Sequence, residues 1–260
     1  MSRTPGVVLT GLCGLAMLAL FAVPAGAQTS EVKEKPPLYS YIADWQIPRA
    51  HWAEMAKANA ANKAILEKAL ADGTIVGYGN DENLIHTADG ETHDNWWSSK
   101  SMAGLVKVLD LFYASPNMAS PALESATKHW DIIFVSRYYN WHPGSFKVGY
   151  TQVSAYKLKA DAPEDAVDMI SKNLVVPLME KMLADGTIIE YEIDTLAVHT
   201  EAPGNFWISY VTPSPEGLDK VNAGIRESLK ASPLAGPAFG SMTDSKGHRD
   251  ELIRGEGTFK

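Results

Sequence analysis

The sequence predicts an α+β fold made of two tandem copies of one β-α-β-β-α-β unit. The segment LADGTIVGY at 70–78 returns almost unchanged as LADGTIIEY at 183–191, an offset of 113 positions. Further matches follow in the same order: His86-Thr87 with His199-Thr200, Asn95-Trp96-Trp97 with Asn205-Phe206-Trp207, and His129-x-Asp131 with His248-x-Asp250. An ordered series of this kind indicates a duplication, and a single doubling is too short for a solenoid, which needs at least about three repeats.

Each copy shows the same series of strand signals, which are runs rich in aromatic and β-branched residues bounded by turn residues. A turn containing Asp89-Gly90, or Pro203-Gly204 in the second copy, is expected to reverse the chain between the two middle strands. A second helix is expected to follow those strands, and a Ser/Pro/Gly-rich irregular stretch to follow the helix. The strands are expected at 39–47, 74–87, 95–98 and 129–139, and again at 147–158, 187–200, 205–211 and 248–259.

The first helix of each copy has recognisable ends. In the first copy it is expected to run from Pro48 to Ala71, with Gly73 just beyond its last turn. In the second copy Gly186 takes the same place, and Pro177 should kink or interrupt the helix. The repeated ADG motif is therefore a helix stop, and its aspartates are interpreted as turn residues rather than as paired catalytic acids.

The order β-α-β-β-α-β is that of the ferredoxin-like split unit, which leaves one face of its sheet bare. Because this order of elements occurs twice, the chain from about Tyr39 to its end resembles the dimeric α/β-barrel superfamily in a fused, two-copy form. Members of that superfamily include antibiotic-biosynthesis-type monooxygenases, muconolactone isomerase-like, YCII-like and EthD-like proteins, and haem-binding relatives. The resemblance implies two ferredoxin-like units packed sheet to sheet as an intramolecular dimeric α/β barrel.

The N-terminal segment predicts export. Residues 1–27 combine an early Arg, an apolar run and a small-x-small site, which is typical of a signal peptide. An uncleaved N-terminal anchor is the alternative. The rest is divided into a flexible leader at 28–37, the first copy at 38–142 and the second copy at 143–260. The expected location is secreted or periplasmic, and cleavage would remove the single cysteine, Cys13, and with it any disulfide or thiol chemistry.

The net charge of the chain excludes some classes of binding partner. The net charge is −8 and no basic cluster occurs, which argues against nucleic acid and, after signal cleavage, against membrane surfaces. A small organic ligand is the expected partner, and a homo-oligomer is compatible with the sequence.

Period-two alternation groups the candidate ligand-binding residues. Polar and aromatic side chains recur on one face of matching strands, and we expect that face to line a chamber between the two sheets. Apolar walls with a few placed polar groups are typical of a ligand site. The residues assigned to ligand binding are Tyr78, Asn95, Trp97, Tyr191, His199, Asn205 and Trp207.

The resemblance implies a cofactor-free monooxygenase or isomerase acting on a small organic or aromatic compound. His93 and His86 are the candidate bases, since each would lie near an apolar wall. The alternative is a non-catalytic binding or structural protein, in which these histidines and tryptophans belong to the core.

A metal or haem protein is a further alternative. The segment HTADGETHDNWW at 86–97 gathers His, Asp and Glu, but its spacing matches no tight ligand signature, so no metal ligand is assigned. The superfamily resemblance also allows a haem held by a histidine. No residue of the sequence marks a haem site, and the cofactor stays unknown.

Overall fold

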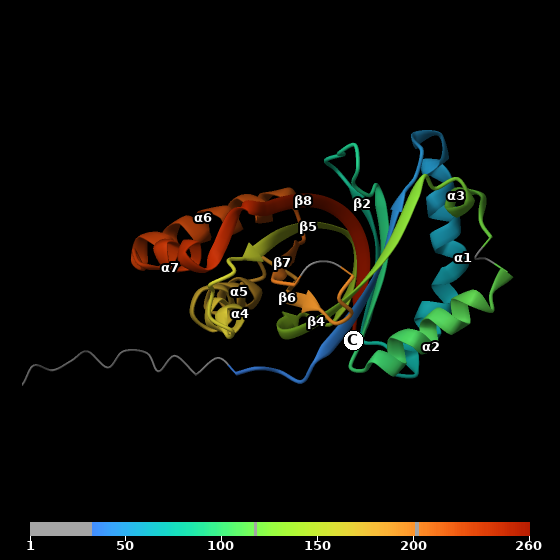
Figure 1. The fold of residues 1–260 in the computed structure, drawn as a ribbon. Coiled ribbons are helices and arrows are strands. Elements are labelled where there is room, and N and C mark those ends of the chain that lie inside the picture. The colour runs from blue at the N-terminus through green and yellow to red at the C-terminus, as the bar shows by residue number, and fades with distance from the viewer. Residues whose placement is uncertain (1–32, 117–118, 201–202) are drawn as a thin grey trace, which may run out of the picture. The chain divides into compact units, whose positions relative to one another are not determined.

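Eight antiparallel strands close into one barrel (Figure 1). The computed structural model describes residues 33–116, 119–200 and 203–260. The predicted signal peptide at 1–27 and the first part of the predicted leader lie outside these described residues. Within the described ranges, no helix combines the length and apolar character needed to cross a bilayer.

The first unit follows the predicted order, with one extra helix before its last strand. Its elements are β1 (Leu38–Gln46), a 3-10 turn η1 (Arg49–His51), α1 (Trp52–Ala71), β2 (Gly77–Asn83), β3 (His93–Ser99), α2 (Met102–Tyr113), α3 (Pro121–Glu124) and β4 (Lys128–Trp141). The second unit repeats it as β5 (Gly144–Leu158), α4 (Ala166–Ile170), η3 (Ser171–Val175), α5 (Val176–Ala184), β6 (Glu190–Leu196), β7 (Asn205–Thr212), α6 (Pro215–Ala231), α7 (Ala235–Met242) and β8 (Thr243–Phe259).

The stretches expected to be irregular contain the short helices α3 and α7, which is a correction to the sequence interpretation. Ser120 accepts a hydrogen bond from the Leu123 backbone N–H, and Pro121 occupies the first turn, so α3 has a regular N-terminus. The predicted interruption of the second unit's first helix is confirmed. A π-helical turn, η3, separates α4 from α5, and Pro177 lies in the first turn of α5.

Each unit contributes four adjacent strands to the barrel. The first unit supplies β4-β1-β3-β2 and the second supplies β8-β5-β7-β6. Two antiparallel seams join them: β2 pairs with β8, and β4 pairs with β6. The helices of the two units cover opposite outer sides of this barrel (Figure 1), so the chain has the fused dimeric α/β-barrel architecture that the sequence predicts.

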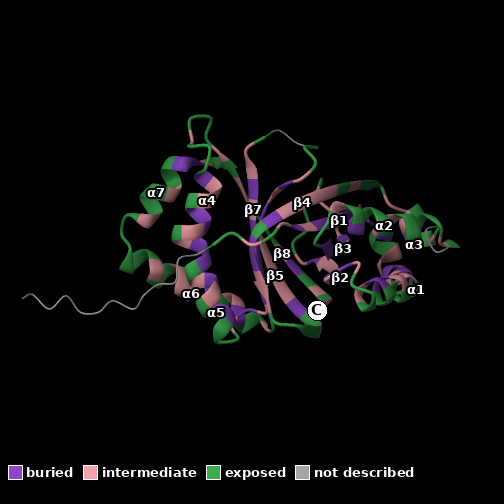
Figure 2. Ribbon diagram, turned by 90° about the horizontal axis from the view of Figure 1, so that it is seen from below, coloured by how far each residue is buried: buried purple, intermediate pink, exposed green. Residues whose placement is uncertain are grey.

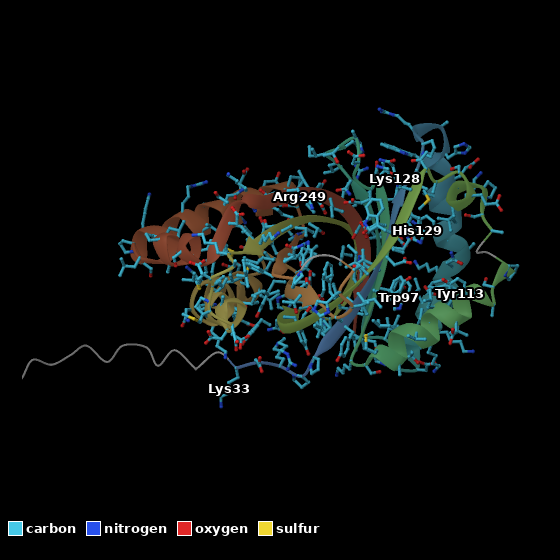
Figure 3. All side chains as sticks on the ribbon, in the orientation of Figure 1. Lys33, Trp97, Tyr113, Lys128, His129 and Arg249 are labelled. Atoms are coloured by element: carbon cyan, nitrogen blue, oxygen red, sulfur yellow. The ribbon has the colours of Figure 1, made fainter. Side chains whose placement is uncertain are left out.

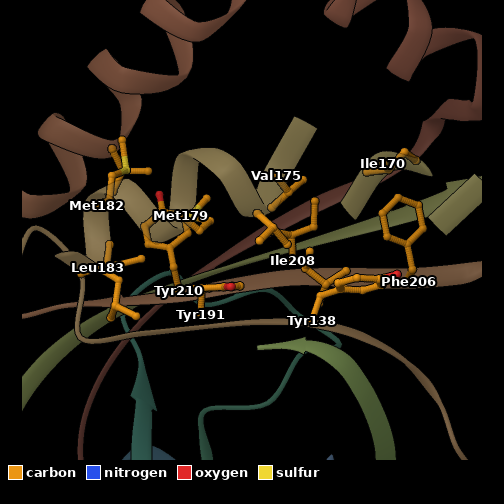
Figure 4. Packing of buried hydrophobic residues seen from close by; sticks show 14 of the residues in the cluster. Tyr138, Ile170, Val175, Met179, Met182, Leu183, Tyr191, Phe206, Ile208 and Tyr210 are labelled. Atoms are coloured by element: carbon orange, nitrogen blue, oxygen red, sulfur yellow. The ribbon is translucent and has the colours of Figure 1, made fainter. Parts of the chain in front are cut away.

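The hydrophobic cores lie between the helices and the outer face of the barrel. In the second unit, Ile170 and Met179 pack against Tyr191 and Phe206, which project from β6 and β7 (Figure 4). The first unit has its own cluster around Trp97, beneath α1 and α2. Figure 2 shows buried residues on the strands and where the helices meet them, and exposed residues along the outer helix surfaces.

The duplicated ADG turns are alike in detail. Gly73 and Gly186 have φ of 79° and 76°, the left-handed region that favours glycine. The Oδ1 atoms of Asp72 and Asp185 each accept a hydrogen bond from the backbone N–H two residues later, at 2.9 Å in both units. These aspartates are turn residues, as the sequence predicts.

Replacing Gly104 by alanine is expected to destabilise the fold by roughly 1–3 kcal/mol, the usual cost of overpacking. A Cβ there would lie 2.7 Å from the Thr74 carbonyl oxygen and still closer to the Ser99 hydroxyl. Gly217 is the equivalent glycine in the second unit, where an added Cβ would lie 2.6 Å from Thr212 Cβ. Urea denaturation measures the effect. The control is Gly240→Ala on α7, where an added Cβ meets no described atom within 4 Å and stability should be unchanged or higher. Equal stability of the two variants would contradict the close packing of α2.

Candidate functional site

A cleft lies between the outer face of the first unit's sheet and its helices. We call it the helix-side cleft. Its volume is about 70 Å³. Trp97, Tyr113 and His129 project into the region between the strands and α1 and α2 (Figure 3). Its lining combines aromatic rings with amides and one His–Asp pair: Tyr41, Trp45, Asn59, Asn62, Asn80, Asn95, Trp97, Tyr113, His129 and Asp131.

Amide side chains form a ladder on one wall of the cleft. Asn95 Nδ2 donates to Asn80 Oδ1 at 2.8 Å and to Asn59 Oδ1 at 3.0 Å. Asn59 and Asn62 are three residues apart on α1, so they lie on one face of that helix. Along this wall, the ladder thus links α1 to β2 and β3.

Two buried polar atoms of the cleft have no hydrogen-bond partner among the described residues. They are Trp45 Nε1, a donor, and Asn62 Oδ1, an acceptor. Because most buried polar atoms in folded proteins are paired, each such atom calls for an explanation. A ligand acceptor would satisfy the first atom, and a ligand donor would satisfy the second.

The His–Asp pair sits beside an aromatic wall. His129 stacks on Trp45 with ring centroids 3.6 Å apart, and its Nε2 lies 3.3 Å from Asp131 Oδ1. Its Nδ1 is 2.8 Å from the carbonyl oxygen of Asp44. A carbonyl only accepts, so Nδ1 donates to it and Nε2 is the nitrogen that faces Asp131.

Tyr41 completes this group. Its ring stacks on Trp97 at 4.3 Å. Burial, and next a hydrogen bond to Asp131, raise the pKa of the Tyr41 hydroxyl, which therefore stays protonated. Tyr41, His129 and Asp131 form a connected polar group at the edge of an apolar cleft.

The second unit repeats the His–Asp pair in different surroundings. His248 Nε2 lies 3.2 Å from Asp250 Oδ2, and the His248 ring stacks on Tyr156 at 4.4 Å. There, however, Tyr156 packs against Phe206 at 5.3 Å and against Phe239 at 5.0 Å. Aromatic rings therefore pack beside this histidine, whereas Asp250 borders the interior of the barrel.

The structure separates the residues that the sequence assigned to one chamber. Asn95 and Trp97 line the helix-side cleft, and Tyr78 belongs to the same first-unit core. The expectation that they face the space between the two sheets is wrong: they project outward, toward the helices. Alternation along a strand identifies residues that share a face, but only the tertiary packing decides which face the helices cover.

The other assigned residues lie in different surroundings. Tyr191 is buried in the second unit's core and donates to Glu180 Oε1 at 2.6 Å. Trp207 lines the interior of the barrel, and Asn205 is partly buried at the start of the same strand, β7. His199 is exposed on the connection after β6. The structure therefore does not bring these four residues together.

The two candidate bases do not line the cleft. His93 is buried, its ring meets Trp52 edge-on at 5.4 Å, and desolvation lowers its pKa. His86 is exposed, with its ring 5.0 Å from that of Trp52. The His–Asp pair was visible in the sequence as the repeated H-x-D motif, whose period-two spacing places both side chains on one face of a strand. It received no role there because nothing in the sequence shows that this face borders a cleft.

The helix-side cleft does not match a metal or haem site. Within the described ranges, no group of three or more His, Cys, Asp and Glu is placed to hold a metal ion. The helix-side cleft, at about 70 Å³, is too small for a porphyrin. Both nitrogens of His129 are engaged, and His142 Nε2 is bound to the Leu183 carbonyl oxygen at 2.7 Å. A haem does not fit the cleft in this conformation.

Comparison with solved structures identifies related folds. A candidate monooxygenase from Fusobacterium nucleatum subsp. nucleatum superposes with a TM-score of 0.63 at 7% identity, over 87% of this chain and 95% of the other. A candidate monooxygenase from Lactobacillus acidophilus NCFM gives a TM-score of 0.56 at 15% identity, over 85% and 94%. No family model and no curated protein sequence matches the chain. At these identities the likeness shows the fold alone.

Proposed function

We propose that this fused dimeric α/β barrel binds a small, planar organic molecule in the helix-side cleft of its first unit. One observation carries the proposal: the cleft holds a buried donor, Trp45 Nε1, and a buried acceptor, Asn62 Oδ1, without partners among the described residues. A phenolic compound supplies both kinds of group on a ring that can lie against Tyr41 and Trp97.

The cleft must widen to admit such a ligand, since organic ligand sites usually measure about 300–1,000 Å³. Tyr113 provides a way to do so. It lines the cleft at the C-terminal end of α2 and is 67% exposed, so its ring can rotate into solvent without breaking a core. We propose that Tyr113 closes over the bound ligand.

The proposed chemistry is removal of a proton by the His129–Asp131 pair. A phenol or an activated CH₂ group held against the pair would lose a proton, and the unpaired donor Trp45 Nε1 would stabilise the resulting anion. With molecular oxygen as oxidant, the CH₂ group becomes a carbonyl, and the second oxygen atom leaves as water with the two hydrogens. Returning the proton to another carbon instead gives an isomerisation. The candidate monooxygenases with this fold support oxygenation as the first reaction to test.

Export belongs to the same proposal. The N-terminal segment has the composition of a signal peptide, so we propose that the protein works outside the cytoplasm.

The test is native mass spectrometry of the full chain after incubation with hydroxylated naphthalenes and anthracenes, combined with oxygen-uptake measurements. Binding with uptake supports an oxygenase, and binding alone supports a carrier. If Trp45→Phe and Asn62→Leu bind every member of the panel as wild-type does, the cleft is not the binding site.

Replacing Asp131 by asparagine is expected to lower turnover by about 10²–10⁴-fold, since Asn cannot accept the proton. Ligand affinity should change much less, because the aromatic walls remain. Steady-state oxygen uptake with the best substrate measures the effect. The matched control is Asp110→Asn on the exposed face of α2, which should turn over like wild-type. If Asp131→Asn turned over at the wild-type rate, Asp131 would not be the residue that accepts the proton.

A further inference from the structure

The interior of the barrel contains a second and larger space, on the opposite side of the sheet from the helix-side cleft. We call it the inner chamber. Its volume is about 660 Å³, within the range of organic ligand sites. Exposed residues of the β2–β3 connection, among them Thr87 and Asp89, line its mouth. The chamber is therefore open to solvent at one end of the barrel.

Three aspartates form a row across its wall. Asp44 on β1 pairs with Asp94 on β3, and Asp94 pairs with Asp81 on β2. Asp44 and Asp94 are buried, and Asp81 accepts a hydrogen bond from Trp96 Nε1 at 3.0 Å. Like charges directly opposite each other destabilise a sheet, so this row is costly for the empty protein.

A second set of carboxylates runs along one strand. Glu190, Glu192 and Asp194 occupy alternate positions of β6, all are buried, and all face the chamber. Ser136 donates to Glu192 at 3.2 Å and also to Asp194. Alternate residues of a strand are about 6.6 Å apart, so these carboxyl groups form a ladder along β6, in which Glu192 is also hydrogen-bonded to Asp194.

The chamber has almost no positive charge to balance these acids. Its lining contains ten Asp and Glu residues and one cationic residue, Arg249, which is exposed (Figure 3). Burial, followed by repulsion from neighbouring carboxylates, raises the pKa of Asp94, Glu190 and Glu192. These carboxyl groups therefore hold a proton more readily than free carboxyl groups do. A cation bound in the chamber would supply the positive charge that the lining lacks and would favour the ionised carboxylates.

An unpaired amide oxygen points to the same kind of ligand. Asn83 is 2% exposed and lines the chamber, and its Nδ2 donates to Glu91 Oε1 at 2.8 Å. Its Oδ1 finds no partner in the part of the chain that the structure describes. This oxygen and the ionised carboxylates are all acceptors, so a ligand that binds them must supply donors. An ammonium group offers three donors and no acceptor.

We propose that the inner chamber binds an aliphatic di- or polyamine. Its separated ammonium groups would pair with the aspartate row and with the β6 ladder, and Asn83 Oδ1 would accept one further N–H. The rings of Trp96, Trp130 and Trp207 line the same space and provide faces for methylene and ammonium groups. A compact divalent cation fits less well, because within the described ranges no three of these acids converge on one point.

Isothermal titration calorimetry of the full chain with spermidine at pH 7.5 tests the proposal. We expect saturable binding that is stronger than for putrescine and absent for a neutral diol of similar length. Asp94→Asn and Glu192→Gln should each weaken spermidine binding by about tenfold or more. Both variants remove repulsion, so both should melt at or above the wild-type temperature. Glu227→Gln, an equal change of charge on the exposed face of α6, should bind spermidine as wild-type does.

Carbodiimide labelling of the unaltered protein gives an independent measurement. Spermidine should protect Glu192 and Asp94 from modification and leave Glu227 reactive. The proposal is overturned if spermidine does not bind, if it protects neither chamber residue, or if Glu227→Gln weakens binding as much as Glu192→Gln. The proposal is also overturned if Ca²⁺ binds more tightly than spermidine and both variants lose that Ca²⁺ binding. The chamber would then be a metal site and not an amine site.

Discussion

Acidifying the solution from about pH 7.5 to about pH 5 is expected to stabilise the ligand-free protein, whereas many proteins lose stability on acidification. Burial raises the pKa of Asp194 from 3.8 to about 6 and that of Asp81 from 3.8 to about 7. The native state then binds more protons than the unfolded chain between about pH 4 and pH 7, so stability falls as the pH rises through that window. At 1.36 kcal/mol per pKa unit, Asp194 alone lowers the free energy of unfolding by about 3 kcal/mol as the pH rises through this window.

One group opposes this trend. Desolvation lowers the pKa of His93, so the unfolded chain takes up that proton first, and stability falls as the pH drops below 6.5. Several buried carboxyl groups of the inner chamber act in the other direction, and their sum should dominate until about pH 5.

Thermal melts at pH 5, 6 and 7.5 measure the balance. Asp194→Asn should raise the melting temperature at pH 7.5 and flatten its dependence on pH. Asp219→Asn, on the exposed surface of α6, should leave the slope as in wild-type. A wild-type melting temperature that falls steadily from pH 7.5 to pH 5 would contradict the raised carboxyl pKa values.

Replacing Phe259 by alanine is expected to lower the free energy of unfolding by about 3–5 kcal/mol, the range for large aromatic residues in a core. Phe259 is 4% exposed and lies at the seam between β2 and β8, opposite Gly77. Its ring meets Trp96 from the first unit at 5.4 Å and Phe146 from the second at 6.3 Å. A Cβ on Gly77 would come within 2.7 Å of this ring, so the glycine makes room for it.

Urea denaturation followed by tryptophan fluorescence and by far-UV circular dichroism measures this loss. Because the ring joins both units, we expect one cooperative transition, displaced to lower urea, rather than separate unfolding of each unit. Phe259→Leu keeps an apolar side chain without the ring, so its loss of unfolding free energy should be about half that of Phe259→Ala. A variant Phe259→Ala within about 1 kcal/mol of wild-type would show that the seam does not depend on this residue.

The duplication, the order of the elements and the helix stops follow from local patterns in the sequence. The ADG turns are an example. Their glycine with positive φ and their aspartate, which accepts a hydrogen bond from the backbone N–H two residues later, depend only on neighbouring residues in the chain. The interruption before Pro177 is local in the same sense. The short helices α3 and α7 were missed because their Ser, Pro and Gly content is also that of a loop.

The position of the site depends on contacts between distant segments. Glu190, Glu192 and Asp194 alternate visibly with Tyr191 and Ile193, and acidic residues on a strand normally face solvent. In this barrel the helices cover the outer face, so Tyr191 turns outward to the core and the acids turn into the inner chamber. In the same way Asn95 and Trp97 face the helix-side cleft. A period of two makes the two faces of a strand distinguishable, and only closure of the barrel between its two seams decides which of them is inside.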